Sequence, residues 1–418
     1  MSTTSPAGTA SGYRSSFLYR IFFAPDALED RKLSTPVKLV LILLLFVLTR
    51  LVTIYGFHYR EVDWMSGESD PQGYVATANY VAQHGCMPTE DKQIYRQFAG
   101  LSLLMIPVSW VTGNMETAGY VVVMLSGIGC LFFMQYLFDD FRLTVIFTVF
   151  MPAWIMSTST IFSEAPTMLC FLTGFWAVRD LRERPGLFYL AILVAGYALV
   201  IRQTSFLFLM PVLFLLAWRF PGGNLRRAIG TCAVASVPIL GYLAWNWFTI
   251  HQLFPQAKLH HEELLHLVQE KIETDHADPA RYSRTMFDVP FHSFVAGITD
   301  PTERLGKRIS AMGIVGTTIA ALAALLLTAW KYRGTPRGLI AAAFGIALLF
   351  HLLFHVSLGG NFGYRWLDRH MSPLSPIIDW VLFYHRPLRW IWIILLIIGG
   401  VVFAANTGIG VRGFGPFK

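Results

Sequence analysis

The stretch VKLVLILLLFVLTRLVTIYGF, residues 37–57, decides the fold. As a helix that rises 1.5 Å per residue, it is long enough to cross a hydrocarbon layer of about 30 Å. Hydrophobic residues make up 54% of the 418-residue chain and charged residues only 14%, whereas a soluble domain carries about 25% charged residues. The sequence therefore predicts an all-α polytopic membrane protein.

Apolar runs of this kind recur along the chain and predict about eleven transmembrane helices. They lie near 37–57, 118–138, 143–162, 165–178, 186–201, 204–218, 228–250, 309–330, 338–356, 373–384 and 389–406. Residues 98–113 are also apolar, but the run is short and Pro107 divides it. This segment is predicted to be an interfacial or re-entrant helix rather than a full span.

Basic residues are concentrated in short loops between the apolar runs, a pattern typical of membrane topology rather than of nucleic-acid binding, despite the net charge of +7. Such loops contain Arg142 and the segments 179–184, 219–227, 331–337 and 385–389. The positive-inside rule places them, with the N-terminus, in the cytoplasm. To keep them on one side, the chain must turn at Arg202–Thr204 and at 163–166, where Pro166 would stop a helix.

This topology divides the chain into three parts. A cytoplasmic and partly disordered segment covers 1–36, the membrane domain covers 37–406, and an outer C-terminal tail covers 407–418. The membrane domain includes two long outer loops, 58–117 and 251–308, and interfacial helices are expected in the first. Three of the four cysteines lie in apolar runs, so no disulfide framework is indicated.

The first outer loop begins with four carboxylates within ten residues: Glu61, Asp63, Glu68 and Asp70. Carboxylates next to the hydrocarbon can act as general bases or can bind a divalent cation. The alternative is that these acids only solvate a loop. Composition alone does not choose between a catalytic cluster and a solvated one.

A helix is predicted directly after this cluster. Tyr74, Ala78, Val81 and Ala82 recur at helical spacing, and Pro71 suits a first helical turn. Asp70 would then cap the helix and be held rigidly, with Tyr74 one turn along on the same face.

The predicted topology places three more ionisable residues, Glu164, Arg202 and Arg365, on the outer side. A guanidinium at a span end can bind phosphate through two parallel hydrogen bonds, or it can serve as an interfacial anchor. Glu164 could orient an acceptor or a metal, or cap a turn. HHEELLH (260–266) lacks the histidine spacing of a zinc protease, so a solvated helix that covers the substrate is favoured there.

Several motifs in this order resemble those of the GT-C class of integral-membrane glycosyltransferases, which use polyprenyl-phosphate sugars as donors. The motifs are D-x-x-G-Y at 70–74, IFSEAPTM at 161–168, ALVIRQTSFLFLMP at 198–211 and GYRWLDRHMSPLSPIID at 363–379. The resemblance covers most of the chain. One departure is Trp366, which stands where the family usually has Tyr.

The resemblance implies a GT-C-like fold and an inverting transfer of a hexose, with mannose favoured, to a lipid, glycan or protein acceptor on the outer face. Asp70 matches the catalytic aspartate, and Glu61 and Asp63 match an acidic doublet. The choice of base between Asp63 and Asp70 stays open. Donor phosphate would be bound by Arg202, Arg365 and Arg369, and Glu164 and Tyr74 would orient the acceptor or a metal.

No cofactor is required on this interpretation, no metal site is assigned, and Mg or Mn is compatible with the acids. The expected partners are the lipid-linked donor, its acceptor and membrane lipids, without nucleic acid. The expected location is a bacterial inner membrane with the site facing the periplasm, or an ER membrane in a eukaryote. The alternative is a transporter or flippase, or a glycan polymerase or ligase, for lipid-linked saccharides. A transporter would show charged or broken-helix sites near the bilayer midplane and an internal repeat, and no such repeat is visible.

Overall fold

The computed structural model describes residues 34–56, 70–89, 98–138, 140–253 and 305–357, together with 255, 374–376 and 394. This described part is almost entirely helical and contains no strand. Four of its helices are long and apolar enough to cross a membrane, at Thr35–Tyr55, Met115–Phe138, Leu225–Ile250 and Pro336–Leu353. The chain is therefore a helical membrane protein. The total of about eleven spans stays a prediction, because 373–384, 389–406 and the C-terminal tail lie almost wholly outside the described residues.

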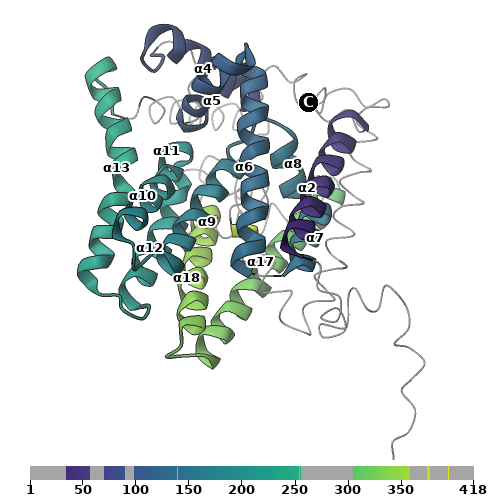
Figure 1. Ribbon diagram of the computed structural model, residues 1–418, viewed down its shortest axis with the longest axis vertical. Coiled ribbons are helices and arrows are strands. Elements are labelled where there is room, and N and C mark those ends of the chain that lie inside the picture. Colours follow the sequence, from purple (N-terminus) through teal and green to yellow (C-terminus); the bar gives the residue numbers. More distant parts are fainter. Residues whose placement is uncertain are drawn as a thin grey trace, which may run out of the picture.

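Figure 1 shows the described helices as one bundle. In chain order they are α2 (Thr35–Leu51), the π-helical turn η2 (Val52–Gly56), α4 (Asp70–His84), α5 (Gly100–Thr112), α6 (Met115–Phe138), α7 (Phe141–Phe150), α8 (Pro152–Ser159), α9 (Glu164–Asp180), α10 (Pro185–Gly196), α11 (Ala198–Ile201), the 3-10 turn η3 (Gln203–Ser205), α12 (Phe206–Arg219), α13 (Leu225–Ile250), α17 (Leu305–Lys331) and α18 (Pro336–Ser357).

Local sequence signals explain where many of these helices begin and end. Asp140 caps α7, because its carboxylate accepts hydrogen bonds from the backbone N–H groups of Arg142 and Leu143. Asn224 caps α13 in the same way. At the C-terminal end of α4, Gly85 adopts a left-handed conformation with φ 70°, which glycine accepts without steric cost.

The basic loops at 179–184 and 219–227 lie against each other, as the charge pattern predicts. Arg182 donates a hydrogen bond of 2.5 Å to the backbone carbonyl of Pro221. Burial and the nearby Arg227 lower the pKa of Arg182 to about 10, so its guanidinium stays charged at neutral pH. Arg179 donates to the carbonyl of Leu137, which places the end of α6 beside them. We call this end of the bundle the basic end.

The predicted turn at Arg202–Thr204 is confirmed. Arg202 leaves the helical conformation, with φ −151° and ψ 115°, between α11 and η3. The chain from α10 to α12 therefore forms a hairpin whose two ends meet at the basic end. The predicted turn at 163–166 is also present, because α8 ends at Ser159 and α9 begins at Glu164.

The prediction of one continuous span over 143–162 is wrong. Helix α7 ends at Phe150, Met151 is extended with φ −85° and ψ 101°, and α8 begins at Pro152. Proline has no backbone N–H and forces the preceding residue out of the helical region, which explains the break. The hydropathy of the segment does not reveal this change in the backbone.

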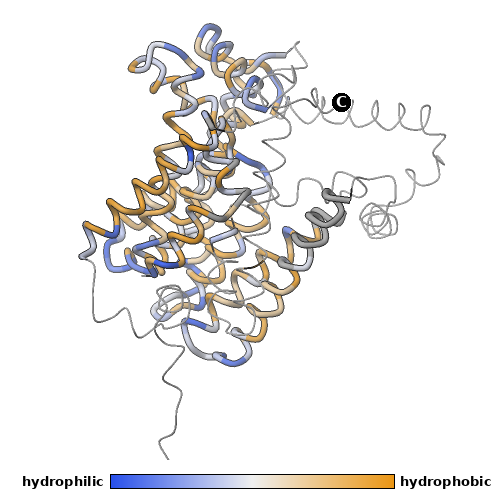
Figure 2. The backbone as a smooth tube through the Cα atoms, turned by 90° about the vertical axis from the view of Figure 1, so that its right-hand side faces the viewer, coloured by the Kyte–Doolittle hydropathy of each residue, from blue (hydrophilic) through white to orange (hydrophobic). Residues whose placement is uncertain are grey.

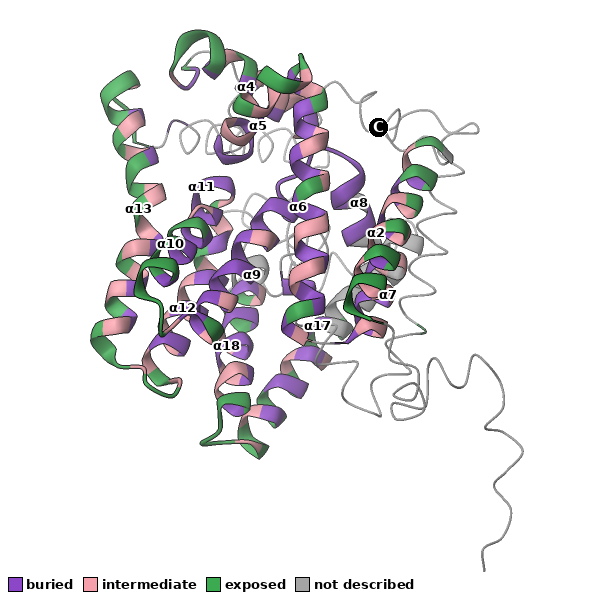
Figure 3. Ribbon diagram, in the orientation of Figure 1, coloured by how far each residue is buried: buried purple, intermediate pink, exposed green. Residues whose placement is uncertain are grey.

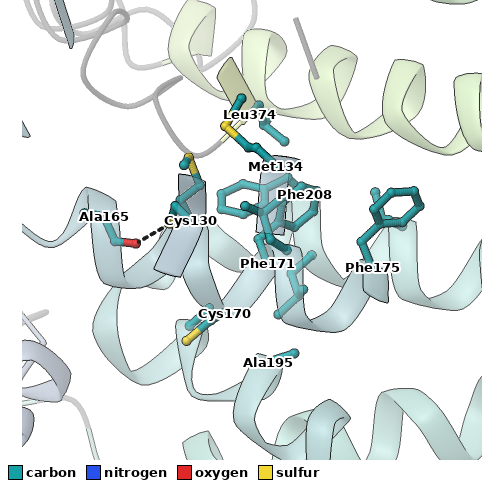
Figure 4. Close-up of a cluster of buried hydrophobic side chains, with 14 of the residues drawn as sticks. Cys130, Met134, Ala165, Cys170, Phe171, Phe175, Ala195, Phe208 and Leu374 are labelled. Atoms are coloured by element: carbon teal, nitrogen blue, oxygen red, sulfur yellow. Dashed lines mark hydrogen bonds between the residues drawn. The ribbon is translucent and has the colours of Figure 1, made fainter. Parts of the chain in front are cut away.

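Aromatic side chains fill the centre of the bundle between α9, α12 and α18. Phe171 meets Phe208 edge-on at a centroid distance of 5.5 Å, and Phe175 meets Phe344 at 5.3 Å. Figure 4 shows Phe171 beside Phe208, with Cys130 and Ala165 nearby. Edge-to-face pairs of this kind add about 1 kcal/mol each to the burial of the rings. Helix α9 is buried along most of its length (Figure 3).

The outer helices present apolar faces to the surroundings. Figure 2 shows hydrophobic residues along the helices, with hydrophilic residues gathered near their ends. In α2, leucines such as Leu44 and Leu48 are more than half exposed, and only Ile42, Phe46 and Arg50 are buried. Exposed leucines are expected on a surface that contacts lipid, whereas a buried arginine in the same helix needs a separate explanation.

Candidate functional site

A buried ion pair joins two of the residues that the sequence singles out. Nη1 of Arg202 lies 2.7 Å from Oε1 of Glu164. The Glu164 side chain is completely buried, and that of Arg202 is 11% exposed. The two residues are far apart in the sequence, and the fold brings them together between the first turn of α9 and the break after α11.

The packing of α9 against α6 fixes the position of Glu164. The thiol of Cys130 lies 3.5 Å from the backbone carbonyl of Ala165, the residue after Glu164, as the dashed line in Figure 4 shows. The hydroxyl of Thr167 donates to the carbonyl of Ser163 at 2.7 Å, which closes the first turn. Pro166 suits this turn because its missing N–H would have no helical partner there. The carboxylate is thus held by a rigid helix start.

Arg202 is positioned by the break between two helices. Its backbone N–H donates to the carbonyl of Ala198 at 2.8 Å, and its own carbonyl accepts a hydrogen bond from the N–H of Ser205 at 3.0 Å. The four residues of α11 before it are all buried. Arg202 therefore leaves a packed helix end with a fixed backbone, and its guanidinium reaches Glu164.

Helices α4 and α5 lie over this end of the bundle, opposite the basic end (Figure 1). Gly100, at the start of α5, packs directly on the backbone of Val200 and Ile201, immediately before Arg202. The hydroxyl of Tyr197 donates to the carbonyl of Gly100 at 2.9 Å. The hydroxyl of Ser102 donates to the carbonyl of Tyr74 at 2.9 Å and ties α4 to α5. We call this the capped end, with α4 and α5 as its cap.

Replacement of Gly100 with alanine tests the docking of the cap. A Cβ atom at Gly100 would overlap the backbone nitrogen of Ile201 and the carbonyl group of Val200, neither of which can move without shifting a helix. We expect Gly100→Ala to destabilise the protein by about 1–3 kcal/mol, the usual cost of overpacking. Thermal unfolding in detergent measures it. The control is Gly241→Ala in α13, where nothing lies within 4 Å of the added atom; equal melting temperatures would contradict the tight docking.

The ion pair lies inside the helical bundle rather than on its surface. Helix α9 has 17 residues and runs from Glu164 to the basic end, a length of about 25 Å. Helix α6 has 24 residues and is about 36 Å long, so it extends well beyond the level of the pair. Removing one member of a buried ion pair costs about 3–5 kcal/mol, because the other charge is left in a medium of low polarity.

The structure places the other predicted site residues as follows. Asp70 lies in the first turn of α4 and is half-buried. Tyr74, Ala78 and Val81 are buried, which confirms the predicted inward face, but Ala82 is exposed and Thr77 takes the inward position. The Tyr74 side chain is only 3% exposed and belongs to the apolar core, which favours a packing role over the orientation of an acceptor.

The remaining predicted residues lie outside the part of the chain that the structure describes. They are Glu61, Asp63 and Glu68 of the acidic cluster, Arg365 and Arg369, and the histidine-rich segment 260–266. Among the described residues, no group of three His, Cys, Asp or Glu side chains could hold a metal ion. The four cysteines are all free thiols.

Arg50 lies within the first span and is completely buried, and it is not among the residues that were predicted to be functional from the sequence. Its Nε donates to Oγ1 of Thr158 at 2.8 Å, and its Nη1 donates to Oγ1 of Thr49 at 2.7 Å and to the carbonyl of Thr148 at 2.9 Å. Residues 148 and 158 would lie about 15 Å apart along a continuous helix. Because one guanidinium contacts both, the chain must turn sharply at the break between α7 and α8.

Arg50 lies near the middle of the bundle. Its guanidinium carbon is 4.2 Å from the ring centre of Phe46 and 5.9 Å from that of Trp154. The Phe46 ring in turn packs on Gly127, which lies halfway along α6. Desolvating a guanidinium costs several kcal/mol, and a contact with an aromatic face returns about 2 kcal/mol. The single Arg in LLFVLTRLV was the signal available in the sequence, since a charge inside a span marks a functional site by default.

A scan against protein-family models finds no match for this chain, and searches of curated proteins and of solved structures find none either.

Proposed function

We propose that the chain is a GT-C-like glycosyltransferase of the bacterial inner membrane, acting on the periplasmic side. It moves a hexose, with mannose favoured, from a polyprenyl phosphate to a lipid, glycan or protein acceptor. The observation that carries the proposal is the buried ion pair between Glu164 and Arg202. It lies at the end of the bundle that α4 covers, and α4 begins with Asp70.

The proposed mechanism uses these groups in distinct roles. The Asp70 carboxylate removes the proton of an acceptor hydroxyl as the hydroxyl oxygen attacks the anomeric carbon from the face opposite the phosphate. The bond from that carbon to the phosphate oxygen breaks, and the phosphate leaves as a stable anion that needs no general acid. Arg202 binds this phosphate, because a guanidinium has five N–H donors, more than its contact with Glu164 through Nη1 requires.

Glu164 acts in this proposal as a positioning residue for Arg202. The carboxylate is fully buried and the guanidinium is partly exposed, so an anion can reach the arginine from the capped end while the carboxylate holds it from behind. The ion pair has no net charge, so a phosphate would bind more strongly if a further cation also contacted it. Arg365 and Arg369 are the sequence-based choices for that cation.

A second function, transport of a lipid-linked saccharide, is favoured by a different observation. Arg50 places a charge near the middle of the bundle, next to the broken helix formed by α7 and α8. Charged groups at interrupted helices near the midplane are typical of transporter sites.

One assay separates the two functions. Purified protein in liposomes receives a labelled polyprenyl-phosphate hexose on the lumenal side, with a membrane extract as the source of acceptor. The enzyme releases polyprenyl phosphate and labels the acceptor, whereas a transporter moves the label across the bilayer with the sugar–phosphate bond intact. Labelled donor that is bound or moved but never cleaved would overturn the glycosyltransferase. Parallel reactions with EDTA and with added Mg or Mn determine whether a divalent cation takes part.

A further inference from the structure

We propose that Arg50 and the break between α7 and α8 form a binding site for the phosphate group of an anionic molecule, separate from Arg202. The proposal does not rest on the chain being a glycosyltransferase, since a transporter or a lipid-regulated protein could use the same site.

Arg50 carries a buried charge that needs a counter-charge. Its side chain is completely buried, and within the part of the chain that the structure describes its contacts are hydroxyls, a backbone carbonyl and aromatic rings, with no carboxylate. The ion pair of Glu164 and Arg202 shows how a buried guanidinium in this bundle is neutralised. A bound anion would supply for Arg50 the counter-charge that Glu164 supplies for Arg202.

Two hydrogen-bond donors at this site lack a partner within the described ranges. Nε and Nη1 are occupied by Thr158, Thr49 and Thr148, but Nη2 is buried and has no hydrogen-bond partner among the described residues. The indole N–H of Trp154, whose ring lies beside the guanidinium, is also buried and has no partner in the part of the chain that the structure describes. Buried donors are nearly always satisfied in folded proteins, so unsatisfied donors on two adjacent side chains point to a ligand.

The backbone around Arg50 is irregular in two places. Helix α2 passes into the π-helical turn η2 one residue after Leu51, directly beyond Arg50, and the α7–α8 break lies opposite. Single π-turns occur frequently at functional sites. Within a membrane, a broken helix is tolerated where it is buried in protein or lines a polar site. Here η2 follows Arg50 closely in the chain, and the α7–α8 break lies between Thr148 and Thr158, the two residues that its guanidinium joins.

The unused groups on Arg50 and Trp154 are hydrogen-bond donors, so the ligand must accept hydrogen bonds. A phosphate oxyanion meets this requirement, because the planar guanidinium fork can donate from Nη2 while the indole N–H donates to another oxygen. Such a phosphate could belong to a lipid headgroup or arrive as free inorganic phosphate. Each source predicts a different result in a binding experiment.

The test is thermal unfolding of the full chain in detergent with four additions: farnesyl phosphate, farnesol, phosphatidylglycerol and inorganic phosphate. We expect a lipid phosphate to raise the melting temperature of the wild type and farnesol to leave it unchanged. A rise with farnesyl phosphate or phosphatidylglycerol alone identifies a lipid source, and a rise with inorganic phosphate identifies the free ion. The proposal is overturned if none of the phosphates raises it.

Variants locate the site. We expect Arg50→Met to reduce the rise and, combined with Arg202→Met, to abolish it. Arg50→Lys should weaken the apparent affinity of the Arg50 site about tenfold, because lysine keeps the charge but loses the fork. Arg219→Gln, at an exposed position at the basic end, should behave as wild type. If Arg202→Met abolishes the rise while Arg50→Met retains it, phosphate binds at Arg202 and the Arg50 site is rejected.

Arg50 also links α2 to α7 and α8, so Arg50→Met could fail to fold. Trp154→Phe then decides the question, because phenylalanine keeps an aromatic ring against Phe147, although a smaller one, and lacks the indole N–H. We expect it to fold and to bind farnesyl phosphate about three- to tenfold more weakly. An unchanged affinity in that variant contradicts the proposed site.

Discussion

Glu164→Gln will lower the free energy of unfolding by about 3 kcal/mol, the lower part of the range for breaking a buried ion pair. The reason is that the guanidinium of Arg202, only 11% exposed and 2.7 Å from the carboxylate, loses its counter-charge without regaining water. Unfolding by heat or by sodium dodecyl sulfate in mixed micelles measures the change. The matched control is Glu183→Gln, the same substitution at an exposed position in the basic loop, where an effect below about 0.5 kcal/mol is expected.

A double-mutant cycle isolates the pair itself from the other effects of each substitution. Glu164→Gln combined with Arg202→Met removes both charges, so the double variant should be less destabilised than the sum of the two single variants. The expected coupling free energy is about 2–3 kcal/mol. Additive single effects would show that the two side chains do not stabilise each other, and the role of Glu164 as the group that holds Arg202 would then be abandoned.

The sequence predicted well those features that depend on short-range pattern. The runs 37–57, 118–138 and 228–250 appear as α2 with η2, α6 and α13, because helix-forming apolar stretches of that length have few other stable structures in a membrane. The hairpin turn at Arg202 followed from the charge of two distant loops. Arg182 and Pro221 now show that these loops are in contact, although which side of the membrane they face stays a prediction.

Other features could not be predicted from the local sequence, for physical reasons. The partnership of Glu164 with Arg202 depends on how α9 packs beside α11, and nothing in either local sequence specifies that contact. The break at Met151 was visible in principle, because Pro152 restricts the residue before it, but the mean hydropathy of 143–162 concealed it. Arg50 was overlooked for the same reason, since one charge changes the average of a long apolar run very little.

Asp70→Asn is expected to have the second large effect, on the rate of sugar transfer rather than on the stability of the fold. If Asp70 is the base that removes the proton of the acceptor, the amide cannot replace it, and the rate of sugar transfer should fall about 10²–10⁴-fold. The fold should survive, because Asp70 lies half-buried in the first turn of α4 and asparagine has nearly the same size and shape. Release of labelled polyprenyl phosphate measures the rate, and the melting temperature checks the fold.

The control for this variant is Asp140→Asn, which makes the same change at the cap of α7 near the basic end, away from α4. It should leave transfer unchanged, since asparagine caps a helix as well as aspartate does. Asp63→Asn addresses the alternative base. Transfer that survives in Asp70→Asn but disappears in Asp63→Asn would assign the proton transfer to Asp63, and Asp70 would then serve to begin α4. If neither substitution slows transfer, the base does not come from this pair, and the mechanism must be sought among the groups around Arg202 or Arg50.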